Sequence, residues 1–250
     1  MINEDFKKWA LGFSGCDGGD IGNAQNQSVW LCGLEWGGGF KPEELADEFK
    51  DDVSEPPAGY ESYERNLAYQ YNIKALKLLC ALNGASDHIK FNKTVQLFTQ
   101  GAKGYFKLNL YPLAFKNTNH SLWSEGFANA TGLKNKGEYI RWIEQNRFPR
   151  LRAWAKERKP RLIICVGISY KNEFIVAFGD EGVQVNGAIA GDKKFYYFKN
   201  KDDTIVAITY FLGNPHGLNS DAAIKSYWRE NSSNFSSKQQ INLALKALNN

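Results

Sequence analysis

The stretch KPRLIICVG, residues 159–167, is the clearest β-strand in the chain. Its centre is continuously apolar and β-branched, and Gly167 closes it. This pattern is typical of a strand that is buried on both faces of a parallel sheet. Helical patterns precede it over residues 141–159 and follow it over residues 168–179. The stretch therefore predicts a parallel sheet with helices on both faces.

Strands and helices continue to alternate on either side of this stretch. We predict further strands over residues 29–34 and 104–112, and a pair of strands within residues 194–213 around the turn NKDD. We predict further helices over residues 4–12, 63–82, 220–231 and 238–248, and a glycine-rich loop over residues 13–28. No internal repeat or long linker divides this order. The predicted fold is one α/β domain over residues 1–250, with three α/β/α layers around a mostly parallel sheet.

The composition excludes several classes of protein. The chain has 250 residues, of which 43% are hydrophobic and 23% charged, values that are ordinary for a globular domain. No window approaches about 18 uninterrupted apolar residues, so no membrane span is predicted. The first residues, MINEDFKKWALG, lack the apolar core of a signal peptide. The four cysteines form no C-x-x-C pair, and three lie in apolar runs, which favours a reduced, cytoplasmic protein.

The basic residues are concentrated in one segment. The net charge is only +4, but residues 141–161 hold eight Lys or Arg against two Glu. Such a segment attracts phosphates if its charges share an exposed face. An ordinary solvated helix face has the same pattern. The charge alone leaves both interpretations open.

Three of the predicted strands end in unusual residues. The first runs into Gly33, Leu34 and Glu35, the second into Asn109, and the last into GNPHGLNS, residues 213–220. In open α/β sheets, ligands bind in a crevice at the carboxyl ends of the strands. We therefore expect these three segments to meet.

Each segment offers a candidate functional residue with a simpler alternative. Glu35 follows a buried strand and precedes three glycines, so it could activate a water or bind a metal, or it could face solvent. Asn109 could read the edge of a base or a peptide-like ligand, or bond to nearby backbone. His216 could donate a hydrogen bond to an anion or a leaving group, or be solvated.

Other residues near the predicted crevice add two weaker candidates. Asp17 and Asp20 could bind a cation, although a turn explains them better because two carboxylates are few for Mg²⁺ or Ca²⁺. Aromatic side chains could stack on a base. Those expected around the crevice are Trp36, Phe40, Tyr60 and Tyr111.

Taken in order, the three segments resemble the motifs of the uracil-DNA glycosylase superfamily. Residues 33–37, GLEWG, share the frame of its first motif (G-Q-D-P-Y, G-I-N-P-G or G-M-N-P-G), with Glu35 at the Asp or Asn position. Residues 214–220, NPHGLNS, are similar to N-P-S-G-L-S of the mismatch-specific branch. Asn109 in LNLYP fits the strand-end Asn that reads the base. The sequence departs from the family at Trp36, which replaces a Pro, and at His216, which replaces a Ser.

The resemblance implies a uracil-DNA glycosylase-like fold, a DNA partner and a role for each matching residue. Glu35 and His216 would be catalytic, with Glu35 positioning or deprotonating the attacking water. Asn109, Phe40, Trp36 and Asn214 would bind the base, with Tyr60 a less favoured alternative for stacking on it. Leu218 would be the wedge that fills the vacated stack, and Gly217 and Ser220 would contact DNA. The close cysteine pair of the iron–sulfur branches is absent, so no iron–sulfur cluster is expected. No other metal or cofactor is expected. A monomer is favoured.

Three hypotheses follow from the sequence. The first is a DNA glycosylase that acts on a damaged or modified base. The second is a non-catalytic protein that binds nucleic acid or nucleotides on the same fold, because several motif positions are substituted. The third is a metal-dependent hydrolase that uses Glu35, Asp17 and Asp20.

Overall fold

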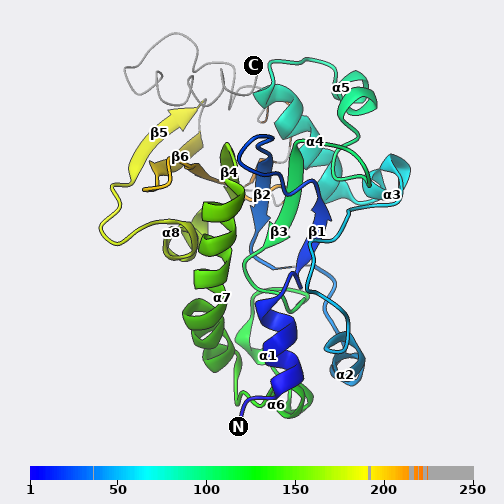
Figure 1. Ribbon diagram of the computed structural model, residues 1–250, viewed down its shortest axis with the longest axis vertical. Coiled ribbons are helices and arrows are strands. Elements are labelled where there is room, and N and C mark those ends of the chain that lie inside the picture. Colours follow the sequence, from blue (N-terminus) through cyan, green and yellow to red (C-terminus); the bar gives the residue numbers. More distant parts are fainter. Residues whose placement is uncertain (36, 191–192, 214–216, 219, 222–223, 225–250) are drawn as a thin grey trace.

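The computed structural model describes residues 1–35, 37–190, 193–213, 217–218, 220–221 and 224 (Figure 1). The helices are α1 (Glu4–Leu11), α2 (Leu45–Glu48), α3 (Tyr63–Leu67), α4 (Gln70–Leu82), α5 (His88–Val95), α6 (Glu125–Thr131), α7 (Lys136–Arg158) and α8 (Lys171–Phe178). The strands are β1 (Cys16–Gly19), β2 (Val29–Gly33), β3 (Tyr105–Asn109), β4 (Leu162–Val166), β5 (Asn186–Ala190), β6 (Lys193–Lys199) and β7 (Ile205–Thr209). Short 3₁₀ turns lie at Pro42–Glu44, His120–Leu122 and Ile168–Tyr170.

The described strands form one sheet of seven, in the order β1-β3-β2-β4-β7-β6-β5. The central strands β3, β2, β4 and β7 are parallel. At the edges, β1 is antiparallel to β3, and β6 is antiparallel to both β7 and β5. Helices α1, α7 and α8 contribute to the apolar cluster on one face of the sheet, and α4 to the cluster on the other. The predicted α/β class with a mostly parallel sheet between helices is confirmed.

The sequence prediction differs from the structure at several places in the described residues, and helices α2, α5 and α6 were not predicted. The glycine-rich segment 13–28 contains β1, whose Gly18 and Gly19 have φ angles of 96° and 106° and so adopt a backbone that glycine favours. Strand β5 was not predicted. The helix expected over residues 63–82 is two helices, because Tyr69 is extended and begins a new helix at its N-cap. The helices predicted over residues 220–231 and 238–248 lie largely or wholly outside the described residues.

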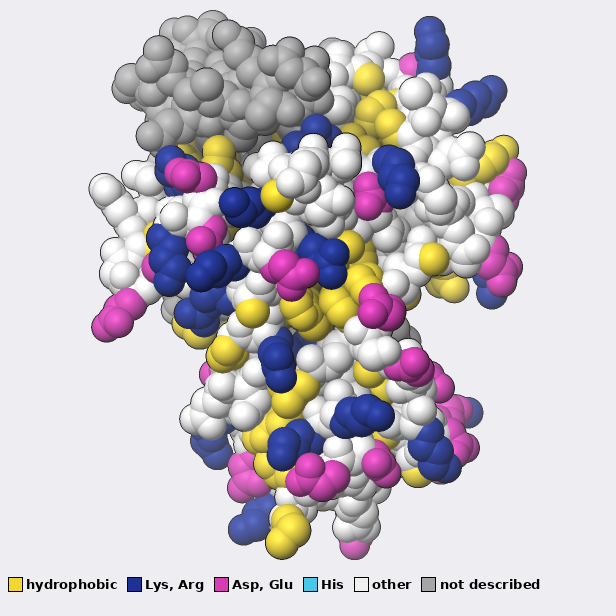
Figure 2. Space-filling view, in the orientation of Figure 1, with side chains coloured by type: hydrophobic (Ala, Val, Ile, Leu, Met, Phe, Trp, Pro, Cys, Tyr) yellow, Lys and Arg dark blue, Asp and Glu magenta, His cyan; other side chains and the backbone are white. Residues whose placement is uncertain are grey.

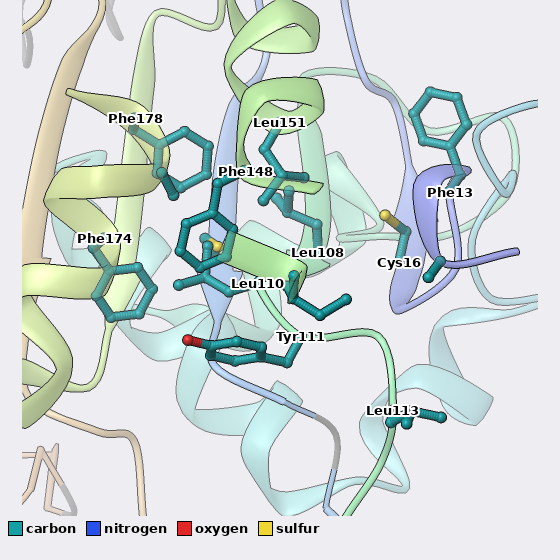
Figure 3. Packing of buried hydrophobic residues seen from close by; sticks show 14 of the residues in the cluster. Phe13, Cys16, Leu108, Leu110, Tyr111, Leu113, Phe148, Leu151, Phe174 and Phe178 are labelled. Atoms are coloured by element: carbon teal, nitrogen blue, oxygen red, sulfur yellow. The ribbon is translucent and has the colours of Figure 1, made fainter. Parts of the chain in front are cut away.

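Large apolar side chains of α7 and α8 pack on the sheet and form part of the core on that face. Figure 3 shows Phe148 and Leu151 of α7 and Phe174 of α8 gathered around Leu108 and other side chains of the sheet. Each of these side chains is fully buried. Burying a side chain of this size contributes about 2 kcal/mol, so this contact fixes α7 firmly against the sheet.

Arg147 of α7 is a buried cation that ties several backbone segments together. Its guanidinium donates to the carbonyl oxygens of Ala10, Gly12, Ser14 and Leu110, over 2.5 to 3.0 Å. These carbonyls belong to the end of α1, the turn before β1 and the residue after β3. The rigid fork of an arginine suits several acceptors at once. One of the eight basic residues of the 141–161 segment is therefore structural.

Candidate active site

The first two of the three strand-end segments lie side by side, as expected. Gly33 of β2 is in register with Asn109 of β3. The ladder continues past the strand ends, where the N–H of Leu110 donates to Gly33 O and that of Tyr111 to Leu34 O. The third segment follows β7, which is separated from β2 by β4. Within it, residues 214–216 and 219 lie outside the described residues.

Glu35 lies just beyond the end of β2 and is paired with a lysine of α7. Its carboxylate Oε2 is 3.5 Å from Nζ of Lys136, and the two side chains are only 8% and 3% exposed. The same ammonium lies 3.9 Å from the centroid of the Phe115 ring and donates to Asn117 O over 3.5 Å. The second oxygen, Oε1, is buried and has no hydrogen-bond partner among the described residues. Glu35 therefore does not face solvent, and one of its oxygens is available to accept.

Burial dominates the ionisation of this pair. It raises the pKa of Glu35 to about 7, although the nearby Lys136 partly opposes the shift. Burial also lowers the pKa of Lys136, against the attraction of Glu35. A carboxyl group with a pKa near neutrality can both take up and release a proton at physiological pH.

Glycines leave space next to Glu35. A Cβ atom built on Gly37 or Gly38 would meet nothing within 4 Å, and both residues are exposed. The expectation that these glycines let a ligand approach agrees with this open surface.

Asn109 is buried and bonded to backbone. Its side-chain amide donates to Gly15 O over 3.0 Å, and only 4% of the residue is exposed. Its Oδ1 lies so close to Gly33 that a Cβ built on this glycine would collide with it, and the Tyr71 hydroxyl would be 3.8 Å from the same Cβ. The backbone bond expected in the alternative for Asn109 is therefore present, and base reading stays a prediction. Among the described residues, no hydrogen bond or ion pair links Asn109 to Glu35 or to a shared partner.

Beside Asn109, a buried polar network contains two residues that the sequence analysis considered separately. Lys107 Nζ is 3.0 Å from Asp17 Oδ1 and donates to Asn72 Oδ1 over 2.9 Å. The Tyr60 hydroxyl donates to the same Asp17 oxygen, and Asn72 donates to Tyr60. Tyr60 is thus engaged in this network. Asp20 accepts from the backbone N–H groups of Gly22 and Gly104, as the turn interpretation predicted.

The other aromatic candidates lie mainly in the core. Phe40 is half-buried and packs edge-on against Trp9, with 6.3 Å between ring centroids. Tyr111 is 5% exposed and donates its hydroxyl to Glu144 over 3.3 Å. Phe40 is the more accessible of these two rings.

The remaining site predictions fall on or beside residues that the structure does not describe. Trp36, Asn214 and His216 lie outside the described residues, and their roles stay predictions. Leu218 is described: it is fully buried in the apolar cluster that includes α4, and its N–H donates to Phe211 O. Gly217 is buried and Ser220 is exposed. A fully buried leucine is not positioned as a wedge.

The C-terminal part of the basic segment lies away from these strand ends. Helix α7 runs antiparallel to the strands, so its first residue, Lys136, meets Glu35. Its last turn leads into β4, where Leu162 is in register with Val29 at the start of β2. The N–H of Arg161 donates to Ser28 O at the same end. The basic residues from Lys156 onward therefore lie at the opposite end of the sheet from Glu35.

Lys136 is the residue of this site that the sequence analysis missed. A signal for it was present, because Asn135 and Glu138 form the pattern of a helix N-terminus. Asn135 Oδ1 does accept from the N–H of Glu138, over 2.9 Å. Starting the helix there would have placed Lys136 in its first turn, at the end of the sheet where Glu35 was expected.

No protein-family model matches the chain. No curated protein matches it either. What the chain does therefore has to be inferred from its own residues. In the part of the chain that the structure describes, no helix is both long and apolar enough to cross a membrane, and no three His, Cys, Asp or Glu side chains are grouped as metal ligands. All four cysteines are buried thiols outside any disulfide.

Proposed function

We propose that the chain is a DNA glycosylase-like hydrolase that cleaves the N-glycosidic bond of a damaged or modified base. The observation that carries the proposal is Glu35, a buried carboxyl at the end of β2 with a pKa of about 7 and one unpaired oxygen. A general base is most effective when its pKa is near the working pH. The order of the three motif-like segments, which resembles the uracil-DNA glycosylase superfamily, supports the choice of substrate.

The proposed reaction uses Glu35 as the base. The target nucleotide is flipped out of the duplex, because its C1′ atom cannot be reached in the stack. Ionised Glu35 accepts a proton from a water, whose oxygen bonds to C1′ while the C1′–N bond breaks. The bonding electrons leave with the base, which then takes up a proton. The carboxylate also stabilises the positive charge that develops on the sugar before Glu35 is protonated.

The other roles in the proposal follow the resemblance where the geometry permits. Asn109 keeps Oδ1 and one amide hydrogen for the edge of a base, and Phe40 offers a half-buried ring. His216, Asn214 and Trp36 keep their predicted roles. The wedge role of Leu218 is not part of the proposal, because that side chain is fully buried.

A second candidate is a non-catalytic nucleic-acid or nucleotide-binding protein. Two observations favour it: Glu35 is already paired with Lys136, and Asn109 is already bonded to Gly15. Both groups would then stabilise the fold, and the strand ends would only bind.

Glu35→Gln separates the two candidates. Base release is measured on duplexes that contain uracil, hypoxanthine, xanthine or 5-substituted pyrimidines, and DNA binding is measured by fluorescence anisotropy. We expect release by the wild type, with a rate that rises with pH through about 7 as Glu35 ionises. Glu35→Gln should lower the rate by roughly 10²-fold or more and leave DNA binding intact.

Glu144→Gln is the matched control, since Glu144 is a partly buried carboxyl of α7 that is bonded to Tyr111 instead. Its rate should stay close to that of the wild type. DNA binding without release from any duplex would reject the glycosylase and leave the binding protein. Release that is unchanged in Glu35→Gln would remove Glu35 from the mechanism.

A further inference from the structure

Two lysines and one tyrosine form a cationic patch where α8 meets β6. Lys171 Nζ lies 4.6 Å from the centroid of the Tyr196 ring, and Lys194 Nζ lies 4.9 Å from it. Lys171 is the first residue of α8, whereas Lys194 and Tyr196 share one face of β6. A tyrosine ring attracts ammonium groups, so Tyr196 holds both lysines beside it.

The lysines of this patch have no acidic partner in the part of the chain that the structure describes. Neither Lys171 nor Lys194 takes part in an ion pair among the described residues. Glu173 is the acidic residue in the first turn of α8, but two residues correspond to about 200° around a helix. Burial is the main cause of the raised pKa of Tyr111 and of Glu144, and repulsion by Glu173 adds to both, so Glu173 lies on the side of α8 that faces α7.

The edge strand leaves the patch open. Gly187 of β5 is in register with Tyr196. A Cβ at this glycine would lie 3.3 Å from Lys194 Cε and 3.7 Å from Tyr196 Cε1, so a larger residue would crowd both side chains. Lys194 is exposed, and Lys171 and Tyr196 are half-buried. The ammonium groups can therefore be reached from solvent.

The patch lies at the same end of the sheet as Glu35. Lys171 follows the end of β4 through Gly167 and the turn Ile168–Tyr170. In the β6–β7 register, Lys194 is level with the residue after β7. The sheet order β2-β4-β7-β6 separates Glu35 from Lys194 by three strand spacings, or about 15 Å. This distance corresponds to a few nucleotides of a bound strand.

We propose that Lys171 and Lys194, held by the Tyr196 ring, bind a backbone phosphate of the nucleic acid close to the nucleotide that Glu35 acts on. A phosphodiester carries one negative charge and strong acceptors, so it can bridge two ammonium groups with charge-assisted hydrogen bonds. The inference rests on nucleic-acid binding, which the proposed glycosylase shares with the nucleic-acid-binding form of the second candidate. It adds the location of a phosphate contact outside the motif-like segments.

The test is the salt dependence of DNA binding in the double variant Lys171→Gln/Lys194→Gln. A 20-base-pair duplex without a modified base and its single strand serve as probes, and anisotropy gives the affinity from about 50 to 200 mM salt. Loss of one phosphate contact lowers the slope of log K against log salt by about 0.9 on a duplex. We expect that change, and an affinity several-fold weaker at the lowest salt.

Lys199→Gln is the matched control, because Lys199 lies on the same strand but is paired with Asp203 at 2.6 Å. Its slope should equal that of the wild type. Tyr196→Phe, which keeps the ring, should bind like the wild type, whereas Tyr196→Leu should behave like the double variant. An unchanged slope in the double variant, an equal change in Lys199→Gln, or no binding of either probe by the wild type would overturn the proposal.

The outcome is independent of the chemistry assigned to Glu35. If the slope falls as expected and no base is released, the phosphate contact stands and the glycosylase fails. If base is released and the slope does not change, the glycosylase stands and this contact fails.

Discussion

Glu35 is held in an environment that its partner only partly compensates. Removing a carboxylate from water is costly, and Lys136 at 3.5 Å does not fully offset the cost, since the pKa of Glu35 stays raised at about 7. Replacing a buried ion pair by apolar side chains of similar size often leaves the stability of a protein unchanged or raises it. Stability alone therefore does not explain a buried Glu35–Lys136 pair. A carboxyl group that exchanges a proton during function explains why the chain retains Glu35 despite this desolvation cost.

This cost predicts a pH-dependent stability difference between the wild type and Glu35→Gln. The pKa is about 7 in the folded chain and 4.5 for an ordinary glutamate. The folded state therefore binds the proton more tightly, a contribution that is fully present below pH 4.5 and lost as the pH rises through about 7. At about 1.4 kcal/mol per pH unit, the wild type should lose up to about 3 kcal/mol relative to Glu35→Gln between pH 4.5 and 8.

Urea unfolding of both proteins at several pH values measures this difference. Glu43→Gln is the control, because Glu43 is an exposed glutamate. Its unfolding free energy should follow that of the wild type at every pH. A difference between wild type and Glu35→Gln that does not change with pH would contradict the raised pKa.

Sequence reasoning found the individual residues of this site better than their partners. A lone carboxylate after a buried strand indicated Glu35, and Asn109 followed from a strand that stops before Pro112. Their contacts could not be read in the same way, because Lys136 is about a hundred residues from Glu35 along the chain. The backbone bond from Asn109 to Gly15 depends on β1, which the glycine-rich composition concealed.

At the scale of elements, α7 connects the candidate site to the core. Its N-terminus supplies Lys136, and its middle carries Arg147 and Phe148 into the interior. The predicted helix began at residue 141, five residues late, because the apolar anchors that marked it start at Trp142. The capped first turn contains few apolar residues, so periodicity alone misses it.

The cap of α7 is expected to control both stability and the position of Lys136. Asn135 accepts the N–H of Glu138, and loss of such a cap costs about 1 kcal/mol. Asn135→Ala should therefore destabilise the chain by about that amount, and Asn135→Asp should restore most of it. Thermal or urea unfolding gives the values.

Asn146→Ala is the control on the same helix, because the exposed Asn146 side chain bonds only to Trp142 O within the helix. Alanine favours a helix interior, so this variant should be as stable as the wild type or slightly more stable. Equal losses in both variants would show that the first turn of α7 has no special role.

At the scale of the whole molecule, the two ends of the sheet differ in what they present. The carboxyl ends of β2, β4 and β7 carry Glu35, the open glycines and the cationic patch around Tyr196. The opposite end carries the last turn of α7, with Lys156. On the face that Figure 2 shows, charges of both signs are interspersed. The net charge of +4 therefore does not by itself indicate where a polyanion binds.

The sequence predicted the layers of the fold but not this division between its ends. Buried parallel strands such as residues 162–166 are recognisable because both of their faces are apolar. A run of basic residues on a helix has no such marker of position. Only the antiparallel direction of α7 places Lys136 and Lys156 at opposite ends of the sheet.

The last prediction tests which end binds DNA. Lys156→Gln removes the charge of an exposed lysine at the amino ends of the strands, and Lys171→Gln removes the charge of a half-buried lysine at the carboxyl ends. Both variants have the same net charge, so any general electrostatic effect is equal. If DNA lies across the carboxyl ends, only Lys171→Gln should reduce the salt slope and weaken binding, since counterions are released only where phosphates are contacted. A reduced slope in Lys156→Gln alone would mean that DNA follows the basic end of α7, and Glu35 would then be too far away to act on it.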